Sequence, residues 1–182
     1  VLNDAAVAIA DHLAAGGGDV LYVDVDAHHG DGVEACFRDS PRVTTISLHQ
    51  HPRSLFPHTG YPAEVGSGEG RGHSLNLALP EEVDDGGWLR ALEAVLLPVA
   101  RELRPSLIVS QHGADTHGRD PLADLAISVE AQHAAALVIR DTARQYAGGR
   151  WVALGGGGYD VADVVPRAWA AVAGAVAGID LD

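Results

Sequence analysis

Short apolar runs alternate with longer amphipathic stretches along most of this chain. Apolar residues at helical spacing predict helices over Asn3–Ala15, Gly87–Leu103, Ser128–Tyr146 and Val161–Ala175. Runs rich in aliphatic and β-branched residues predict strands at Val20–Val25, Val43–Leu48, Ser74–Leu79, Ser106–Ser110 and Trp151–Gly155. Because these strands lack polar alternation and are interleaved with helices, we predict an α/β fold whose mostly parallel sheet is covered on both faces.

The segment from His49 to Gly72 departs from this pattern. It contains Pro52, Pro57 and Pro62 together with several glycines, and it is predicted to be a long loop within the domain. Long loops inside compact domains are usually functional.

Composition and charge narrow the class of protein. The chain has 182 residues, of which 47% are hydrophobic and 20% charged, as expected for one globular domain. Its net charge of −13 disfavours binding to nucleic acid or to an anionic membrane, and suits a partner that carries positive charge. The longest nearly apolar stretch, Ala168–Ile179, is too short to span a bilayer.

The first residue and the single cysteine add two further expectations. Because a primary translation product begins with methionine and this chain begins with Val1, we expect it to be part of a longer protein. Cys36 has no second cysteine with which to form a disulfide, which fits a reducing cytoplasm, and it is predicted to be a small buried hydrophobe.

Acidic, histidine and tyrosine side chains follow the ends of three predicted strands. Asp26 and His28 come after the first strand, Asp115 comes after the fourth, and Tyr159 comes after the fifth. Ligand sites in parallel sheets lie beyond the carboxyl ends of the strands, so we expect these side chains at one edge. Asp26 and His28 are two residues apart and would point to the same side of an extended segment, which suits one metal ion.

This ligand set is typical of catalytic rather than structural zinc. With Asp115 as the third ligand, two oxygens and one imidazole nitrogen leave a coordination position open for water and substrate. The alternative is an ordinary turn in which the aspartates cap backbone groups and the histidines are merely hydrogen-bonded. An aspartate at a second strand end favours the metal site.

A run of glycines, Gly155–Gly158, comes directly before Tyr159. Without Cβ atoms, this backbone can approach a ligand closely and would place the phenol at the rim of the site. A phosphate cradle is a competing hypothesis, but the chain contains neither GxGxxG nor GxxxxGK followed by Ser or Thr. Tyr159 taken alone could also be a half-buried core tyrosine.

Four motifs stand in order along the chain: DVDAHHGDGVEACF, TISLHQHPRSLFPHTG, SQHGADTH and GGGGYDVADVVPRAW. Together they resemble the class I-like histone deacetylase superfamily, and most closely its bacterial acetoin-utilisation protein branch. The resemblance extends from Asn3 to Trp169. It implies the arginase/deacetylase fold, with three α/β/α layers, and a single deacetylase-like domain over residues 1–182 that lacks the N-terminal part of the family domain.

The resemblance also implies a catalytic metal centre. Asp26, His28 and Asp115 match the ligands of a catalytic zinc ion, for which iron is an alternative. Tyr159 matches the tyrosine that hydrogen-bonds the substrate carbonyl.

Further roles are implied around this centre. Asp24 and Asp31 match the acids that orient two catalytic histidines. The walls of the acyl-lysine channel match Phe56, Leu122 and Gly157. A first potassium site matches Asp24, Ser47 and Leu48 with backbone oxygens of Asp26 and His28, and a second matches Phe37 and Val43.

One family element is missing from this sequence. In the family, a tandem His-His pair and a Gly-Phe element precede the segment that here begins VLND. His28 and His29 do not replace that pair, because His28 is assigned to the metal and His29 belongs to the same motif. The chain therefore resembles the second part of a deacetylase, without its general base.

The leading hypothesis is a zinc-dependent deacetylase that converts acetylated lysine in a protein, or a small acetylated amine, to acetate and the free amine. An arginase-type ureohydrolase is an alternative, because Asp26–His28 resembles part of a DxHxD motif, although its next ligand would fall on Gly30. A third hypothesis is a catalytically inactive module that binds a metal or acyl-lysine, which the missing histidines favour.

Overall fold

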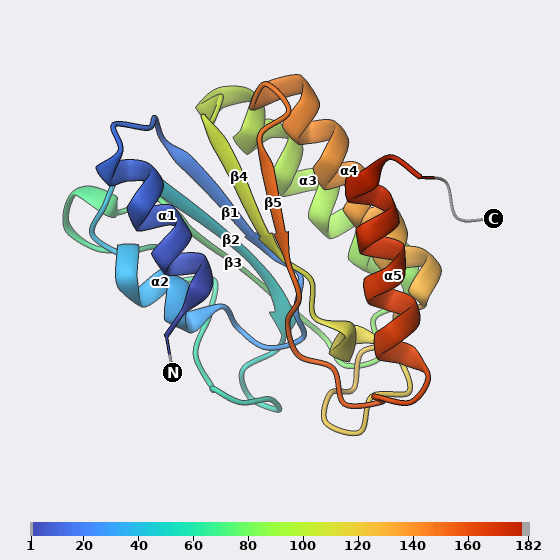
Figure 1. The fold of residues 1–182 in the computed structure, drawn as a ribbon. Helices are drawn as coiled ribbons and strands as arrows, with labels where there is room; N and C mark the ends of the chain where they lie inside the picture. Colours follow the sequence, from blue (N-terminus) through green and yellow to red (C-terminus); the bar gives the residue numbers. More distant parts are fainter. Residues whose placement is uncertain (1, 180–182) are drawn as a thin grey trace.

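The computed structural model describes residues 2–179, and a central sheet runs through them (Figure 1). The elements are, in order, α1 (Asp4–Ala14), β1 (Val20–Asp24), α2 (Asp31–Phe37), β2 (Val43–Gln50), the 3₁₀ turn η1 (Gly68–Gly70), β3 (Ser74–Leu79), α3 (Asp85–Leu103), β4 (Leu107–Gln111), the 3₁₀ turn η2 (Ala114–Thr116), α4 (Val129–Tyr146), β5 (Trp151–Leu154) and α5 (Val164–Ala177).

The sheet has five strands in the order β3-β2-β1-β4-β5, and every neighbouring pair is parallel. Helices α1 and α2 lie on one face, and α3, α4 and α5 lie on the other (Figure 1). This confirms the predicted α/β fold with three layers. Because all strands run the same way, their carboxyl ends meet at one edge, where Asp24 of β1 is level with Ser47 of β2 and Gln111 of β4.

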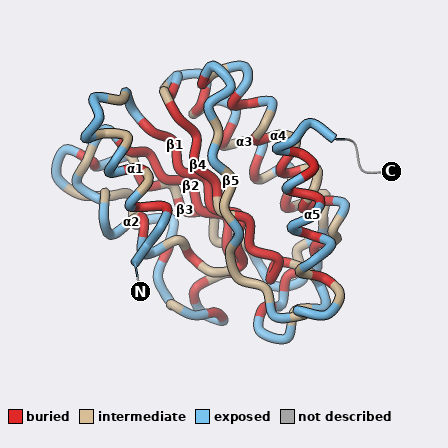
Figure 2. The backbone as a smooth tube through the Cα atoms, in the orientation of Figure 1, coloured by how far each residue is buried: buried red, intermediate tan, exposed pale blue. Residues whose placement is uncertain are grey.

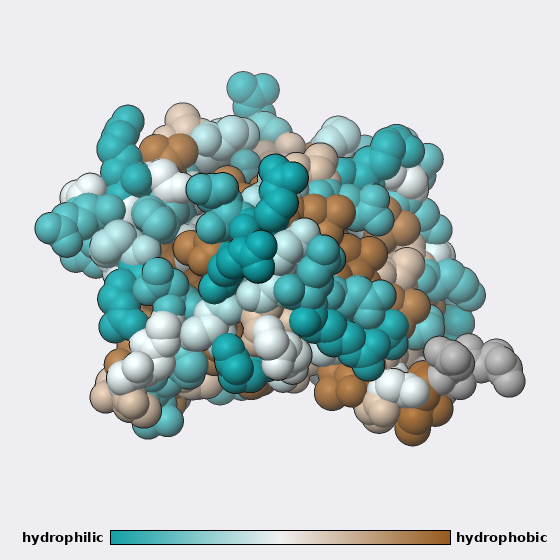
Figure 3. Space-filling model, turned by 90° about the horizontal axis from the view of Figure 1, so that it is seen from above, coloured by the Kyte–Doolittle hydropathy of each residue, from teal (hydrophilic) through white to brown (hydrophobic). Residues whose placement is uncertain are grey.

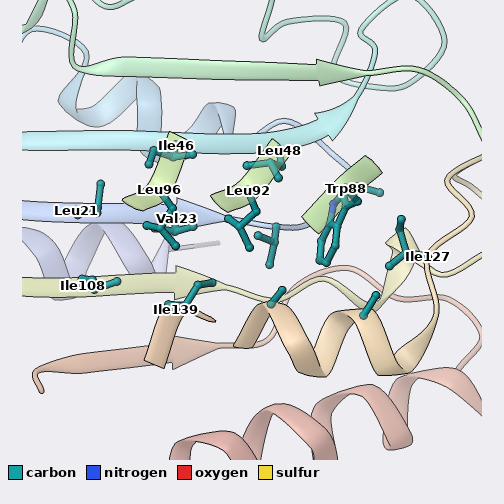
Figure 4. Packing of buried hydrophobic residues seen from close by; sticks show 14 of the residues in the cluster. Leu21, Val23, Ile46, Leu48, Trp88, Leu92, Leu96, Ile108, Ile127 and Ile139 are labelled. Carbon is teal, nitrogen blue, oxygen red and sulfur yellow. The ribbon is translucent and has the colours of Figure 1, made fainter. Parts of the chain in front are cut away.

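The central strands are buried along their length, and β1 and β2 have no exposed residue (Figure 2). Trp88, Leu92 and Leu96 of α3 are spaced four residues apart and fully buried, and they pack with Ile139 of α4 against the sheet (Figure 4). Burying one such side chain stabilises the fold by roughly 1.5–3 kcal/mol. This layer therefore holds the strand ends in a fixed position.

Seen from above, where the strands begin, hydrophilic side chains cover much of the surface, with smaller hydrophobic areas among them (Figure 3). Within residues 2–179, no helix is both long enough and apolar enough to cross a membrane.

The sequence interpretation missed α2. This helix has seven residues, begins after Gly30 without a side-chain cap, and buries only Val33, so it carries neither a cap signal nor an apolar stripe. The prediction that Cys36 is buried is wrong, because Cys36 lies on this largely exposed helix and is itself exposed. The predicted loop from His49 is also shorter than expected, since β2 continues through Gln50.

His112, just beyond β4, connects three elements. Trp151 Nε1 of β5 donates to Ser110 Oγ at 2.7 Å, and the Ser110 hydroxyl lies 2.8 Å from His112 Nε2. Trp169 Nε1 of α5 donates to the His112 carbonyl at 3.0 Å. Because the Ser110 oxygen already accepts from Trp151, its own proton is free to bond a neutral His112 ring. Burial lowers the pKa of His112 to about 4.

We expect acid to destabilise the fold through His112. Between pH 6.5 and about 4 the unfolded chain binds one proton more than the folded chain at this residue. The free energy of unfolding therefore decreases as the pH is lowered through this range. The slope reaches about 1.4 kcal/mol per pH unit, and above the ordinary histidine pKa it vanishes. Chemical denaturation from about pH 7 to about pH 4.5 should show a shallower slope for His112→Gln than for the wild type. Equal slopes would contradict this prediction.

Candidate metal centre

Two segments that leave neighbouring strands bring Asp26, His28 and Asp115 together. Asp26 and His28 follow β1, and Asp115 lies in η2 after β4, the strand that pairs with β1. His28 Nδ1 lies 3.1 Å from Asp26 Oδ1 and 2.9 Å from Asp115 Oδ2. One ligand atom from each residue lies within 4.8 Å of the other two. The three residues expected to share a metal ion therefore lie at one place.

Backbone N–H groups hold the two carboxylates in this position. Asp26 accepts from the N–H of Gly157 at 2.6 Å and from that of His28 at 2.8 Å. Asp115 accepts from the N–H of Ala27 at 2.9 Å through the oxygen that does not face His28. Both carboxylates are buried, so these hydrogen bonds replace the water that each would otherwise bind. One oxygen of Asp115 is left directed at the centre.

The paired carboxylates favour positive charge between them. Hydrogen bonds to Asp115 and then to Asp26 raise the pKa of His28 to about 10. Burial raises the pKa of Asp115 to about 6. Burial also opposes ionisation of Asp26, but hydrogen bonds from His28 and Gly157 hold the pKa of Asp26 below its ordinary value.

This donor set fits a divalent ion. The two carboxylates make positive charge favourable at the point where the three ligand atoms converge. Two carboxylate oxygens and one imidazole nitrogen are ligands that zinc and ferrous iron both accept.

Glycines are required where other backbone segments approach the centre. A Cβ atom on Gly157 would lie 2.0 Å from Asp115 Oδ2, and one on Gly113 would lie 2.2 Å from Asp26 Oδ2. Gly157 belongs to the glycine run, whose backbone packs against the carboxylates. The close approach that the glycines were expected to permit is thus an approach to the two candidate ligands Asp26 and Asp115.

Tyr159 stands at the rim of the centre. Its ring lies 6.4 Å from that of His28, edge to face at 80°, and the residue is 45% exposed. Burial, and then the negative charge of Asp115, raise the pKa of the Tyr159 phenol. The hydroxyl therefore remains protonated at neutral pH.

The two aspartates expected to orient catalytic histidines have different surroundings. Asp24 is buried, accepts from the Tyr22 hydroxyl at 2.6 Å and from the N–H of Asp26 at 3.0 Å, and burial raises its pKa to about 8. Asp31 is exposed in the first turn of α2. Within residues 2–179 neither carboxylate is hydrogen-bonded to a histidine ring, so their expected role stays a prediction.

The remaining residues expected to bind potassium or to line a channel lie on several different elements. Ser47 and Leu48 are buried in β2, while Phe37 ends α2 and Val43 begins β2. These potassium sites stay predictions. Phe56 and Leu122 lie in the loops after β2 and β4, and they are 70% and 53% exposed. Their role as channel walls also stays a prediction.

Sequence reasoning missed the network that engages His29. Its Nδ1 lies 2.9 Å from Thr59 Oγ1, and its Nε2 lies 3.1 Å from Glu34 Oε2. The neighbouring ring of His49 lies 2.9 Å from the carbonyl of Gly60. These contacts tie the long loop to the end of β1. The contact between His29 and Thr59 joins residues 30 positions apart, so no local spacing could have indicated it.

The three-layer fold and the three converging side chains define a protein of the α/β/α class with a candidate metal site. The chain matches the histone deacetylase domain family over residues 1–176 and belongs to that family.

Curated relatives and solved structures agree with this assignment. The acetoin utilization protein AcuC of Bacillus subtilis is 44% identical over 180 residues, which are 99% of this chain and 46% of that protein. AcuC of Staphylococcus aureus is 37% identical over 153 residues, 84% of this chain and 39% of that protein. The crystal structure of an HDAC homologue complexed with SAHA has a TM-score of 0.90 at 33% identity, over 100% of this chain and 47% of that chain. The chain thus spans less than half the length of these relatives.

We expect Asp115→Asn to weaken Zn²⁺ binding by about 100-fold or more, because it removes one of the two facing charges while preserving an acceptor for Ala27. Titration calorimetry with Zn²⁺ measures this. Glu34→Gln is the matched control, since Glu34 also contacts a histidine but lies outside the group of three ligands. Equal affinities for Asp115→Asn and the wild type would argue against the metal site.

We expect Gly157→Ala to lower both metal affinity and stability, because its Cβ would displace Asp115 Oδ2. Zinc titration and thermal unfolding check the two effects. Gly86→Ala is the control, since the nearest atom there is the flexible end of Arg90, at 3.0 Å. Equal zinc affinity and equal thermal stability of the Gly157→Ala and Gly86→Ala variants would show that Asp115 does not need a glycine at residue 157.

Proposed function

We propose that this chain carries the metal centre of a deacetylase that hydrolyses the acetamide of acetylated lysine, or of a small acetylated amine, to acetate and free amine. Membership of the histone deacetylase domain family supports this proposal. The observation that carries it is the convergence of Asp26, His28 and Asp115 beside the rim residue Tyr159.

We propose Zn²⁺ as the ion held by Asp26, His28 and Asp115, with Fe²⁺ as an alternative; when bound, it would acidify a water molecule and polarise the acetamide carbonyl. Tyr159 donates a hydrogen bond to the acetamide oxygen and to the negative charge that develops there. Its raised pKa keeps it in the donor form. Asp26 and Asp115 are held by backbone N–H groups, so the ligands need no rearrangement.

A general base is the missing element of this site. His28 is a ligand, and both ring nitrogens of His29 are engaged, by Thr59 and by Glu34. Asp24 and Asp31 have no histidine bonded to them within the described residues. We therefore propose that the tandem histidines come from a polypeptide segment outside this chain, and that Asp24 and Asp31 orient them.

The exposed edge of the sheet at β5 is the proposed attachment point for that segment. Within residues 2–179 β5 pairs only with β4, and it lies in front of the other strands in Figure 1. Val152 is 38% exposed, and an apolar groove of about 470 Å³ beside the strand is lined by residues including Leu154, Trp169 and Val176. Exposed edges readily accept another strand. We propose that the chain is a single deacetylase-like domain once the remaining part is added here.

We propose that the protein works in the bacterial cytoplasm, a reducing compartment. We also propose that potassium ions bind at the two sites described above. The net charge of −13 suits a substrate whose flanks, or whose amine product, are positively charged. A binuclear ureohydrolase centre is not supported, because in the described part of the chain only Asp26, His28 and Asp115 converge.

Acetate release from an acetyl-lysine peptide tests the proposal. The zinc-loaded chain is fused to the segment that precedes the matched region in the Bacillus subtilis relative. We expect turnover that a chelator abolishes and that Tyr159→Phe lowers by about 100-fold. The unfused chain should retain less than about one-hundredth of the activity, because it lacks a general base.

Tyr61→Phe is the matched control for Tyr159→Phe, since Tyr61 is a partly exposed tyrosine in the long loop, in contact with His51 rather than with a metal ligand. Its activity should equal that of the unaltered fusion. Peptide binding without acetate release would support the inactive binding module instead. Absence of both binding and release would overturn the proposed function.

A further inference from the structure

One carboxylate joins the two loops at the rim of the metal centre. Asp120 lies in the loop after η2, and its Oδ2 accepts from the backbone N–H of Tyr159 at 2.9 Å. Its Oδ1 accepts from the backbone N–H of Leu122, also at 2.9 Å. Tyr159 follows β5, whereas Leu122 follows β4. Asp120 thus fixes the rim tyrosine and the predicted channel wall relative to each other.

The segment that carries Tyr159 has a second attachment point closer to the metal ligands. The N–H of Gly157 donates to Asp26 at 2.6 Å, and its carbonyl accepts from the N–H of Ala114 at 2.7 Å. Gly158 separates this point from Tyr159 and has a φ of +150°, in a region that glycine enters readily. The path of the chain after Gly157 is therefore not determined by local preference. The bond from Asp120 supplies a constraint on the other side of Gly158.

Ion pairs connect the same two loops further out. The Arg119 guanidinium lies 3.0 Å from Asp160 and also contacts Asp163. Arg119 is largely exposed, and exposed ion pairs contribute little to stability. Hydrogen bonds from backbone N–H groups to a carboxylate are stronger than bonds between neutral groups. Arg119 reaches only the side chains of Asp160 and Asp163, whereas Asp120 bonds the backbone of Tyr159 itself, so Asp120 is the more direct connection to the tyrosine.

We propose that Asp120 is the positioning residue of Tyr159. It holds the backbone of the tyrosine so that the hydroxyl faces the substrate oxygen above Asp26, His28 and Asp115. The role of the hydroxyl rests on the proposed function, but the constraint on the backbone does not.

Amide hydrogen exchange measured by NMR on the whole chain tests the constraint without metal or substrate. In Asp120→Ala the amides of Tyr159 and Leu122 should exchange about 10-fold faster or more. The amide of Gly157, which is bonded to Asp26, should exchange as in the wild type. Asp120→Asn retains one acceptor oxygen and should give an intermediate result. Unchanged exchange at Tyr159 in Asp120→Ala would overturn the proposal.

Binding of SAHA to the zinc-loaded chain tests the consequence for the site. SAHA is a hydroxamate, and its carbonyl oxygen offers an acceptor to the Tyr159 hydroxyl. We expect Asp120→Ala to weaken SAHA binding by about 10-fold while zinc affinity stays unchanged. In a Tyr159→Phe background the same substitution should have little further effect, because the hydroxyl that it positions is gone.

Two control variants separate positioning from a general effect on the loops. Arg119→Ala removes the outer ion pairs but not the bonds of Asp120, and Asp11→Ala removes an exposed carboxylate on α1. Both should bind SAHA as the wild type does. If Asp120→Ala lowers SAHA affinity equally with and without the Tyr159 hydroxyl, the positioning role is overturned. Failure of the zinc-loaded wild type to bind SAHA would instead contradict the proposed function, while the exchange result would still decide the backbone constraint.

Discussion

Two buried carboxylates directed at one imidazole nitrogen form the constraint on which the rest of the structure depends. Negative charge that is removed from water is costly unless hydrogen bonds or an opposite charge compensate it. The backbone N–H groups of Ala27, His28 and Gly157 provide the hydrogen bonds. They reach the carboxylates because β1 and β4 are neighbours and because glycines allow the segment after β5 to come close. Fold and site are thus parts of one electrostatic arrangement.

The sequence predicted much of this arrangement because its main signals are local. The strands are continuous apolar runs, and parallel strands necessarily place Asp26, His28 and Asp115 at one edge. The two-residue spacing of Asp26 and His28 is also visible in the sequence itself. The glycine run indicated a close backbone approach, although only the structure identifies Asp26 and Asp115 as the groups approached.

What the sequence could not predict depends on contacts between distant residues. Helix α2 has no side-chain cap and buries one residue, so its formation depends on the elements around it. Thr59 reaches His29 from the folded loop, while Glu34 reaches it from α2. The same holds for Asp120, since a lone aspartate beside a proline is typical of many turns. Its contact with Tyr159 joins the loops that follow the paired strands β4 and β5, and the two residues are 39 positions apart.

The pairing of β1 with β4 has a consequence for how the molecule assembles. In the observed alignment Asp24 is level with Gln111. Sliding one strand by a single residue would displace its ligand by about 3.3 Å. Coordination bonds tolerate errors of only about 0.2 Å. A bound ion would therefore stabilise the observed register of β1 and β4 relative to any shifted register.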